Sequence, residues 1–135
     1  MTFRETLTIH LQALQGRDLA TLMGTVSPDS LTLITASGRV IRTAAEFARI
    51  HQAWFSSMSW TMDVSLVTAM DAHSLGVATL LLDYRDDPDD GPPVRRKSLL
   101  TLVFALRDGG WELVLDQNTP IKETPDEDEE GGSGE

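Results

Sequence analysis

The sequence contains no cysteine. This absence excludes a disulfide scaffold, a zinc site built on thiolates, and a thiol nucleophile. Long hydrophobic runs are also missing. None reaches the roughly 18 residues that a transmembrane helix needs, and the first ten residues, MTFRETLTIH, do not read as a signal peptide. These absences predict a cytoplasmic protein without a membrane partner.

Basic residues are scarce. Eleven Lys and Arg stand against 21 Asp and Glu, which gives a formal net charge of −10. A surface that binds nucleic acid needs clustered Lys and Arg to neutralise phosphates, so we expect no nucleic-acid partner. The 135 residues are 41% hydrophobic and 24% charged. This composition is typical of one soluble globular domain.

Much of the negative charge lies at the end of the chain. Residues 122–135 hold seven acids and one lysine, and so six of the ten net negative charges, but no large apolar residue. Such a segment cannot bury enough apolar surface to offset its ordering entropy. We predict a folded domain over residues 1–121 and a disordered acidic tail over residues 122–135. The tail either increases the solubility of the protein or attracts a basic binding partner.

Three helices are expected before residue 59. Apolar residues recur at three- and four-residue steps in residues 2–15. Asp18 can cap a second, short helix, and Thr43 can cap a third, with Glu46 three residues later completing a capping box. The apolar stripes of the first and third helices are Phe3, Leu7, Leu11 and Leu14, then Phe47, Ile50, Trp54 and Met58.

The rest of the chain predicts β-structure. A small hairpin is expected over residues 30–41, and four strands over residues 59–71, 75–85, 94–106 and 111–119. The third of these strands would be about 40 Å long, so it must curve or contain a bulge. The fold class is therefore α+β, with a long curved sheet wrapped around helices.

The order of these elements resembles the nuclear transport factor 2-like superfamily, in its SnoaL-like and ketosteroid isomerase-like branch. Residues 107–114 (RDGGWELV) resemble the turn, tryptophan and final strand of that superfamily, and residues 117–120 (QNTP) resemble its SgcJ/EcaC-type subgroup. The resemblance covers about residues 1–121. It implies a cone-shaped α+β barrel, or cystatin-like roll, with three N-terminal helices on a curved, mostly antiparallel sheet of about six strands.

In such a cone the pocket lies between the concave face of the sheet and the third helix, so strand parity identifies inward side chains. If Ala72 and His73 form the tip of their hairpin, Met62 pairs with Asp83. Met62 belongs to the apolar side of its strand, and Asp83 is therefore predicted to point inward.

The turn type decides the face of the last strand. A three-residue loop in the last hairpin places Asp116 and Asn118 inside with Leu102 and Phe104, whereas a two-residue loop reverses the face. Two glycines in this turn favour the three-residue loop with a left-handed bulge residue. Asp116 and Asn118 are predicted to face the pocket, and related family members also place polar pocket residues at these offsets.

Two inward carboxylates, Asp116 and Asp83, are the candidate catalytic groups. A buried carboxylate without a partner has a raised pKa, which a general base working near neutral pH requires. Two such groups facing one cavity can abstract and return a proton. The alternative for Asp83 is an ion pair with Arg85 or Arg96, and the alternative for Asp116 is bonding to neighbouring backbone or hydroxyl groups.

Five further residues are candidates for binding a ligand. Two tryptophans would form walls, an arginine and an asparagine would supply polar groups, and a histidine would lie near the rim, with His10 as the other candidate there. Core packing is the alternative for Trp54, and a strand-end hydrogen bond is the alternative for Asn118. These candidates are Trp54, Trp60, Arg96, Asn118 and His51.

No metal or cofactor is expected. The three histidines, His10, His51 and His73, are too scattered in the sequence to predict a metal site, and no Gly-rich dinucleotide loop is present.

The superfamily includes isomerases, cyclases, dehydratases and non-catalytic proteins on one cone. Ketosteroid isomerases place a catalytic acid near the first hairpin, but residues 31–37 hold none. We therefore expect a domain that binds a small apolar ligand, with a role in (secondary) metabolism. The alternatives are an acid–base enzyme of isomerase or cyclase type acting on a polyketide-like or other apolar substrate, and a non-catalytic dimerisation module.

The outer face of the predicted sheet is apolar as well, and a patch of this kind usually marks an interface. We therefore expect a homodimer through the convex face of the sheet. With Asp83 assigned inward, the residues placed on that outer face are Leu80, Leu82, Tyr84, Val103 and Ala105.

Overall fold

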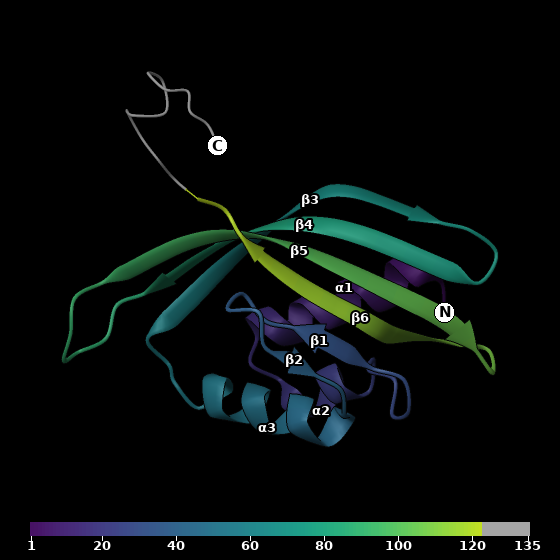
Figure 1. Ribbon diagram of the computed structural model, residues 1–135, viewed down its shortest axis with the longest axis horizontal. Helices are drawn as coiled ribbons and strands as arrows, with labels where there is room; N and C mark the ends of the chain where they lie inside the picture. The colour runs from purple at the N-terminus through teal and green to yellow at the C-terminus, as the bar shows by residue number, and fades with distance from the viewer. Residues whose placement is uncertain (123–135) are drawn as a thin grey trace.

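Three helices lie in the first half of the chain in the computed structural model, which describes residues 1–122 (Figure 1). The helices are α1 (Phe3–Gln15), α2 (Leu19–Met23) and α3 (Ala44–Phe55), with β1 (Thr32–Ile34) and β2 (Val40–Ile41) between the last two. Four long strands follow: β3 (Trp60–Asp71), β4 (Leu75–Asp86), β5 (Val94–Arg107) and β6 (Gly110–Pro120). The element order is the predicted one. The predicted disordered tail, apart from Lys122, lies outside the described residues.

Polar side chains cap the helices as predicted, with one difference. The Asp18 carboxylate accepts a hydrogen bond of 3.1 Å from the backbone N–H of Thr21. Thr43 Oγ1 accepts one of 3.1 Å from the N–H of Glu46. The Glu46 carboxylate does not complete a capping box, because it pairs with the Arg39 guanidinium at 2.8 Å. That ion pair links the start of α3 to the residue that directly precedes β2.

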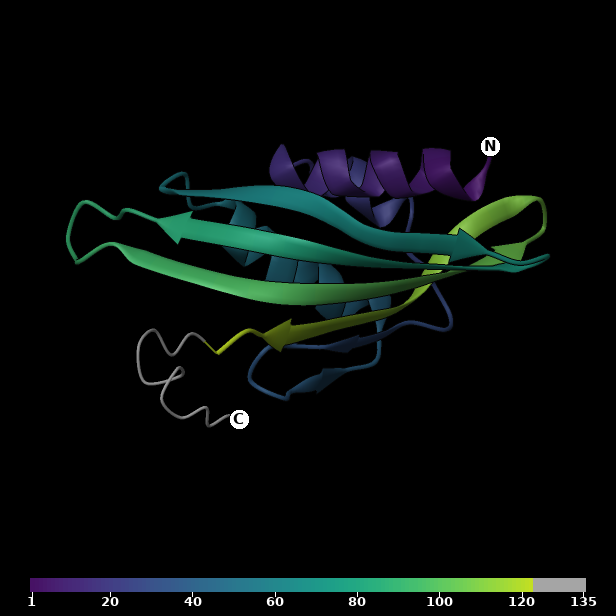
Figure 2. The same ribbon diagram turned by 90° about the horizontal axis from the view of Figure 1, so that it is seen from above.

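The six strands form one sheet in the order β2-β1-β6-β5-β4-β3. All neighbouring strands are antiparallel except β1 and β6, which are parallel. The sheet is long and curved, α1 runs along one of its faces, and α2 and α3 lie below the long strands (Figures 1 and 2). The predicted α+β cone with a mostly antiparallel sheet is therefore confirmed.

The core lies between the helices and the concave face of the sheet. Side chains from every layer meet there, and the Phe3 ring of α1 packs edge-on against Phe104 of β5 with ring centroids 5.8 Å apart. The least exposed apolar members are Phe3, Leu22, Ile41, Phe47, Trp60, Ala78, Leu80, Leu102, Phe104 and Leu113.

The β3–β4 hairpin contains a β-bulge that the sequence did not reveal. Leu66 pairs with Leu80 but Thr68 pairs with Thr79, so Val67 is an extra residue on β3. A bulge of one residue reverses the face of everything beyond it. Asp83 consequently faces Asp63, and the prediction that it points inward is wrong.

The same bulge corrects the predicted outer face. Leu80, Leu82 and Tyr84 pair with Leu66, Val64 and Met62 and lie on the concave side, so they belong to the interior. The outward-facing apolar residues on the neighbouring strands alternate with these and include Val77, Leu81, Leu99, Val103 and Leu115.

The β5–β6 hairpin also contains a bulge. Arg107 pairs with Gly110 across a two-residue turn, in which Asp108 and Gly109 have φ of 50° and 80°, so the predicted three-residue loop is wrong. The extra residue is Val114 instead, because Phe104 pairs with Leu113 and Val103 with Leu115. The two-residue turn and the bulge together restore the predicted parity.

Asp116 therefore pairs with Leu102 and Asn118 with Leu100, and both polar residues share the concave face of β6.

No helix within residues 1–122 has the length and apolar character needed to cross a membrane.

Candidate functional site

A pocket of about 350 Å³ opens on the concave face of the sheet beside α3. This volume lies within the range of small-molecule sites. Its apolar lining comes from α3, β3, β4 and the strand ends: Ala36, Trp54, Met62, Leu82, Tyr84 and Pro120. Its polar lining comes from β5 and β6: Arg96, Lys97, Ser98 and Asn118.

Trp54 forms the aromatic end of the pocket, and Trp60 is stacked behind it. Trp54 lines it, and its ring stacks on Trp60 at a centroid distance of 4.3 Å. Trp60 is 1% exposed and donates its indole N–H to the Trp54 carbonyl at 3.1 Å. The Arg17 guanidinium carbon packs over the Trp60 ring, 4.0 Å from the ring centroid. Trp60 therefore lies behind Trp54 and holds its backbone and ring in place.

Arg96 and Asn118 supply polar atoms to the pocket. The Arg96 guanidinium carbon lies 5.0 Å from the Tyr84 ring centroid, a cation–π contact. The Asn118 Oδ1 atom is buried and has no hydrogen-bond partner within residues 1–122. A buried acceptor of this kind normally receives a hydrogen bond from a donor. Asn118 Oδ1 can therefore accept a hydrogen bond from a bound molecule.

Asp116 is not among the residues that line the pocket. It lies two residues from Asn118 on the same face of β6, about 6.6 Å away along the strand. It is 5% exposed, between Leu33 of β1 and Leu102 of β5. No residue within 1–122 donates a hydrogen bond or an ion pair to its carboxyl group, so the alternative of a bonded Asp116 is not realised.

Burial alone raises the pKa of Asp116 to about 7. The charged form loses its hydration on burial and gains no partner in return, so the neutral form is favoured. The carboxyl group can therefore hold or release a proton near neutral pH.

His10 and His51 lie inside the cone, and the prediction that either lies near the rim is wrong. The Thr25 hydroxyl donates to the Leu22 carbonyl at 2.7 Å, so Nδ1 of His10, 2.8 Å from that hydroxyl, must carry the proton. His51 Nδ1 donates in the same way to the Phe47 carbonyl at 2.8 Å.

Both histidines are neutral at physiological pH. Burial lowers the pKa of the fully buried His10 to about 3, with a smaller contribution from nearby His51. Burial also lowers the pKa of His51, which is 7% exposed. The Nε2 atom of His10 is left as a buried acceptor without a partner within residues 1–122. The His51 ring lies behind the pocket, edge-on to Trp54 at 5.9 Å.

Asp83 lies on the opposite face and does not reach the pocket. Arg95 donates two hydrogen bonds to its carboxylate, of 3.2 and 2.9 Å. These bonds hold the pKa of Asp83 below its usual range. The alternative of an ion pair is correct in kind, but the partner is Arg95 and not Arg85 or Arg96. Asp83 is no longer a catalytic candidate.

Seven pocket residues were not among the predicted site residues: Ala36, Met62, Leu82, Tyr84, Lys97, Ser98 and Pro120. Strand β4 is apolar on both faces, so its composition does not indicate which face is inside. Only the register across the β3 bulge settles the question, because it places Leu82 and Tyr84 opposite Val64 and Met62.

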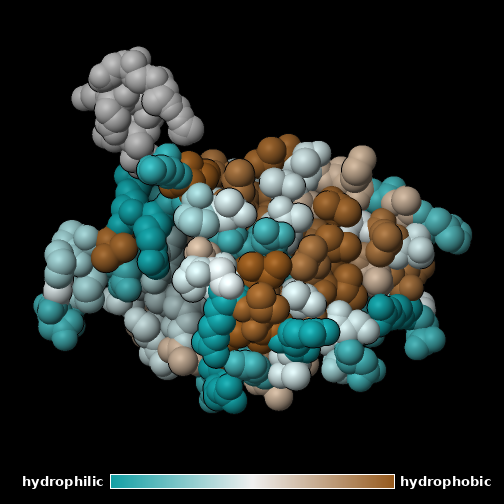
Figure 3. All heavy atoms as spheres, viewed as in Figure 1, coloured by the Kyte–Doolittle hydropathy of each residue, from teal (hydrophilic) through white to brown (hydrophobic). Residues whose placement is uncertain are grey.

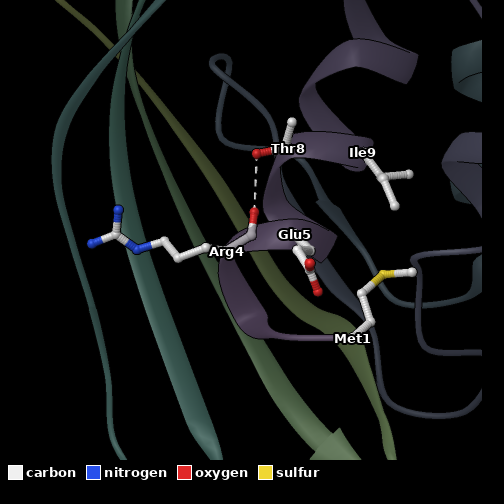
Figure 4. A pocket seen from close by; sticks show the side chains of 5 residues that line it. All are labelled: Met1, Arg4, Glu5, Thr8 and Ile9. Atoms are coloured by element: carbon white, nitrogen blue, oxygen red, sulfur yellow. Dashed lines mark hydrogen bonds between the residues drawn. The ribbon is translucent and has the colours of Figure 1, made fainter.

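A second hollow, of about 650 Å³, lies on the outer side of α1 (Figure 4). The Thr8 hydroxyl returns to the Arg4 carbonyl at 3.0 Å, and the Arg4 guanidinium reaches the Ala69 carbonyl at 3.3 Å. The side chains around it point apart, so it offers no converging polar groups. Within the described part of the chain, no three His, Asp or Glu side chains gather as metal ligands. The concave pocket is therefore the candidate site.

The SnoaL-like domain family matches residues 4–117 of the chain. This range runs from the second residue of α1 to Gln117 of β6, and it ends one residue before Asn118. A comparison with curated proteins finds none that matches.

Solved structures show the same fold. A candidate calcium/calmodulin-dependent protein kinase type II association domain from Thiobacillus denitrificans has a TM-score of 0.75 and 19% identity, over 90% of this chain and 96% of that chain. A ketosteroid isomerase-like protein from Erwinia carotovora atroseptica has a TM-score of 0.74 and 11% identity, over 89% and 94%. An uncharacterised protein with a cystatin-like fold from Caulobacter vibrioides has a TM-score of 0.71 and 18% identity, over 95% and 91%.

Proposed function

The chain belongs to the SnoaL-like domain family, within the nuclear transport factor 2-like superfamily, and from that premise we propose that its concave pocket binds a small, largely apolar molecule. The observation that carries this proposal is a pocket of about 350 Å³ with an aromatic and aliphatic lining. Few polar groups converge on it, which is the usual composition of a small-molecule site. Trp54, supported by Trp60, would contact the flat face of a ligand.

The test is calorimetric titration with 2-naphthol, a neutral aromatic probe. We expect saturable binding to the wild type and loss of binding in Ser98→Phe, because the larger side chain fills the pocket. The matched control is Thr119→Phe, which adds the same ring on the outward face of the neighbouring strand β6, where Thr119 pairs with Leu99. Equal binding by the two variants, or no binding by the wild type, contradicts the proposal.

Acid–base chemistry is the second candidate function, and Asp116 favours it. A carboxyl group with a pKa of about 7, buried beside an apolar pocket, can accept a proton from carbon in its ionised form and return it from its neutral form. No acid in residues 31–37 joins it, so the arrangement differs from that of a ketosteroid isomerase with a base near the first hairpin.

This second function is tested by exchange of the C1 protons of 2-tetralone for deuterium, followed by NMR. The wild type should accelerate the exchange over buffer, and Asp116→Asn should remove the acceleration while 2-naphthol still binds. Binding of 2-tetralone without any acceleration contradicts the acid–base function and leaves the binding function standing.

We also propose that the chain forms a homodimer through the outer face of the sheet. Apolar residues gather there over β4, β5 and β6 on the side away from α1 (Figure 3). Val77, Leu81, Leu99, Val103 and Leu115 share that face and are each only partly buried in the single chain. A second copy would remove this patch from water.

A further inference from the structure

The charge of the pocket is opposite to that of the chain. The sequence has a net charge of −10, yet no Asp or Glu within residues 1–122 lines the pocket, whereas Arg96 does. Arg96 is an exposed residue at its end of the pocket, where its positive charge attracts anions from solvent. A negatively charged group on a ligand would therefore be favoured at this end of the pocket.

Arg96 differs from most arginines of the described chain. Its one interaction there is the contact with the Tyr84 ring, which leaves the N–H groups at the edge of the guanidinium available as donors. A carboxylate is the group that best matches two parallel guanidinium N–H donors. The arginines that already pair with carboxylates are Arg39, Arg49, Arg85, Arg95 and Arg107.

Asn118 indicates a second group that the ligand should carry. Its Oδ1 atom is a buried acceptor without a donor, so the matching ligand group is a hydroxyl or an N–H. Asn118 pairs with Leu100, four residues along β5 from Arg96 on the same face, a separation of about 13 Å along the strand. The apolar side chains of Leu82 and Tyr84 line the pocket on the adjacent strand, where they pair with Ser98 and Arg96. The two polar groups therefore lie toward opposite ends of an apolar wall.

We propose that the ligand is an aromatic hydroxy acid, with its carboxylate on the Arg96 guanidinium, its ring system against Trp54 and Tyr84, and its hydroxyl donating to Asn118 Oδ1. This inference rests on the proposed function, because it requires that the concave pocket binds a small molecule. It adds the chemical class of that molecule and the direction in which it lies.

Three probes that share one ring system separate the contributions. They are 6-hydroxy-2-naphthoate, which carries both groups at opposite ends, 2-naphthoate, which lacks the hydroxyl, and 2-naphthol, which lacks the carboxylate. Calorimetric titration at pH 8 should show 6-hydroxy-2-naphthoate binding roughly tenfold more tightly than 2-naphthol, the effect of one charged hydrogen bond. It should also bind more tightly than 2-naphthoate.

Two variants assign these preferences to their residues. Arg96→Gln should remove the advantage of 6-hydroxy-2-naphthoate over 2-naphthol, and Asn118→Leu should remove its advantage over 2-naphthoate. Arg42→Gln is the matched control, because it deletes the same charge at an exposed arginine that does not line the pocket. It should preserve both preferences.

The outcomes are distinguishable from those of the proposed function. Equal affinity for the three probes, or a carboxylate preference that Arg96→Gln leaves unchanged, overturns the hydroxy-acid inference while the binding function stands. Binding of none of the probes overturns both.

Discussion

At the residue scale, the burial of Asp116 without a partner has a cost to stability with a predictable pH dependence. Its pKa is about 7 in the folded chain, against 3.8 for an aspartate side chain in water. Between these two pH values the folded state holds a proton that the unfolded state has released. The free energy of unfolding therefore falls as the pH rises from about 4 to 7.

Asp116→Asn removes this cost. The variant should be more stable than the wild type at pH 8, by on the order of 4 kcal/mol at most, and the gain should shrink toward pH 4. Urea denaturation at both pH values measures it. Asp83→Asn is the control, since its half-buried carboxylate is paired with Arg95 and the substitution should produce no such pH-dependent gain. A loss of stability in Asp116→Asn at pH 8 would show that the carboxylate has a partner.

His10 has the opposite pH dependence. Its pKa of about 3 lies below the ordinary histidine value of 6.5, so only the unfolded state takes up a proton between these values. The free energy of unfolding should therefore fall as the pH drops from about 6.5 toward 3. His10→Gln keeps a side chain able to donate to Thr25 but cannot be protonated.

Denaturation series from pH 7 to pH 4 should show a smaller loss of stability in His10→Gln than in the wild type. Thr25 Oγ1 is the only polar partner of His10 within the described residues, so the comparison isolates the titration of the ring. Parallel pH profiles for the two proteins would contradict the assignment of a neutral, buried imidazole.

At the element scale, two β-bulges decide which predictions hold. Some features depend only on residues that are neighbours in the sequence, and these could be predicted. Examples are the helix caps Asp18 and Thr43 and the alternation of apolar and polar residues in β3. A bulge depends on packing between strands, and neither Val67 nor Val114 carries a local signal for one. The unseen bulge on β3 turned Asp83 outward.

On β6, the inward placement of Asp116 was predicted for a different reason from the one observed. The predicted bulge residue lay in the turn, whereas the observed one, Val114, lies within the strand. Both positions add one residue and give the same parity. Burial of Asp116 could therefore be predicted, but the lining of the pocket by Leu82 and Tyr84 could not.

Packing of α1 on the sheet requires a glycine on β4. A Cβ atom at Gly76 would lie 2.6 Å from two carbons of the Phe3 ring, and Phe3 is 1% exposed. Gly76→Ala should therefore cost about 1–3 kcal/mol in the free energy of unfolding, because the helix or the ring must shift.

The matched control is Gly91→Ala, in the exposed loop between β4 and β5, where the nearest atom is the Cγ of Pro88 at 3.7 Å. Urea denaturation compares the two variants. Equal stability of the two would mean that α1 is not seated against this position.

At the scale of the whole molecule, the outer face of the sheet predicts self-association. The chain has a mass of 14.8 kDa, and sedimentation at micromolar concentration should give twice that value. Leu99→Glu places a charge at the centre of the apolar face, where Leu99 pairs with Leu81, and should yield a monomer.

Met58→Glu is the control for this prediction. Met58 is also apolar and is 76% exposed, but it lies beyond α3 and not on the sheet, so the variant should remain a dimer. A monomeric wild type, or a Leu99→Glu variant that still dimerises, would place the interface elsewhere.

The central feature of the molecule is an unpaired acid buried beside the apolar pocket of the cone, and its pKa can be measured without knowing the ligand. The measurement is an NMR titration of the aspartate side-chain carboxyl carbons in ¹³C-labelled protein, with the Asp116 signal assigned from its absence in Asp116→Asn. The account predicts a titration midpoint near pH 7 for that signal. A midpoint near the ordinary value of about 4 would place Asp116 in water or beside a cation, and would contradict the account.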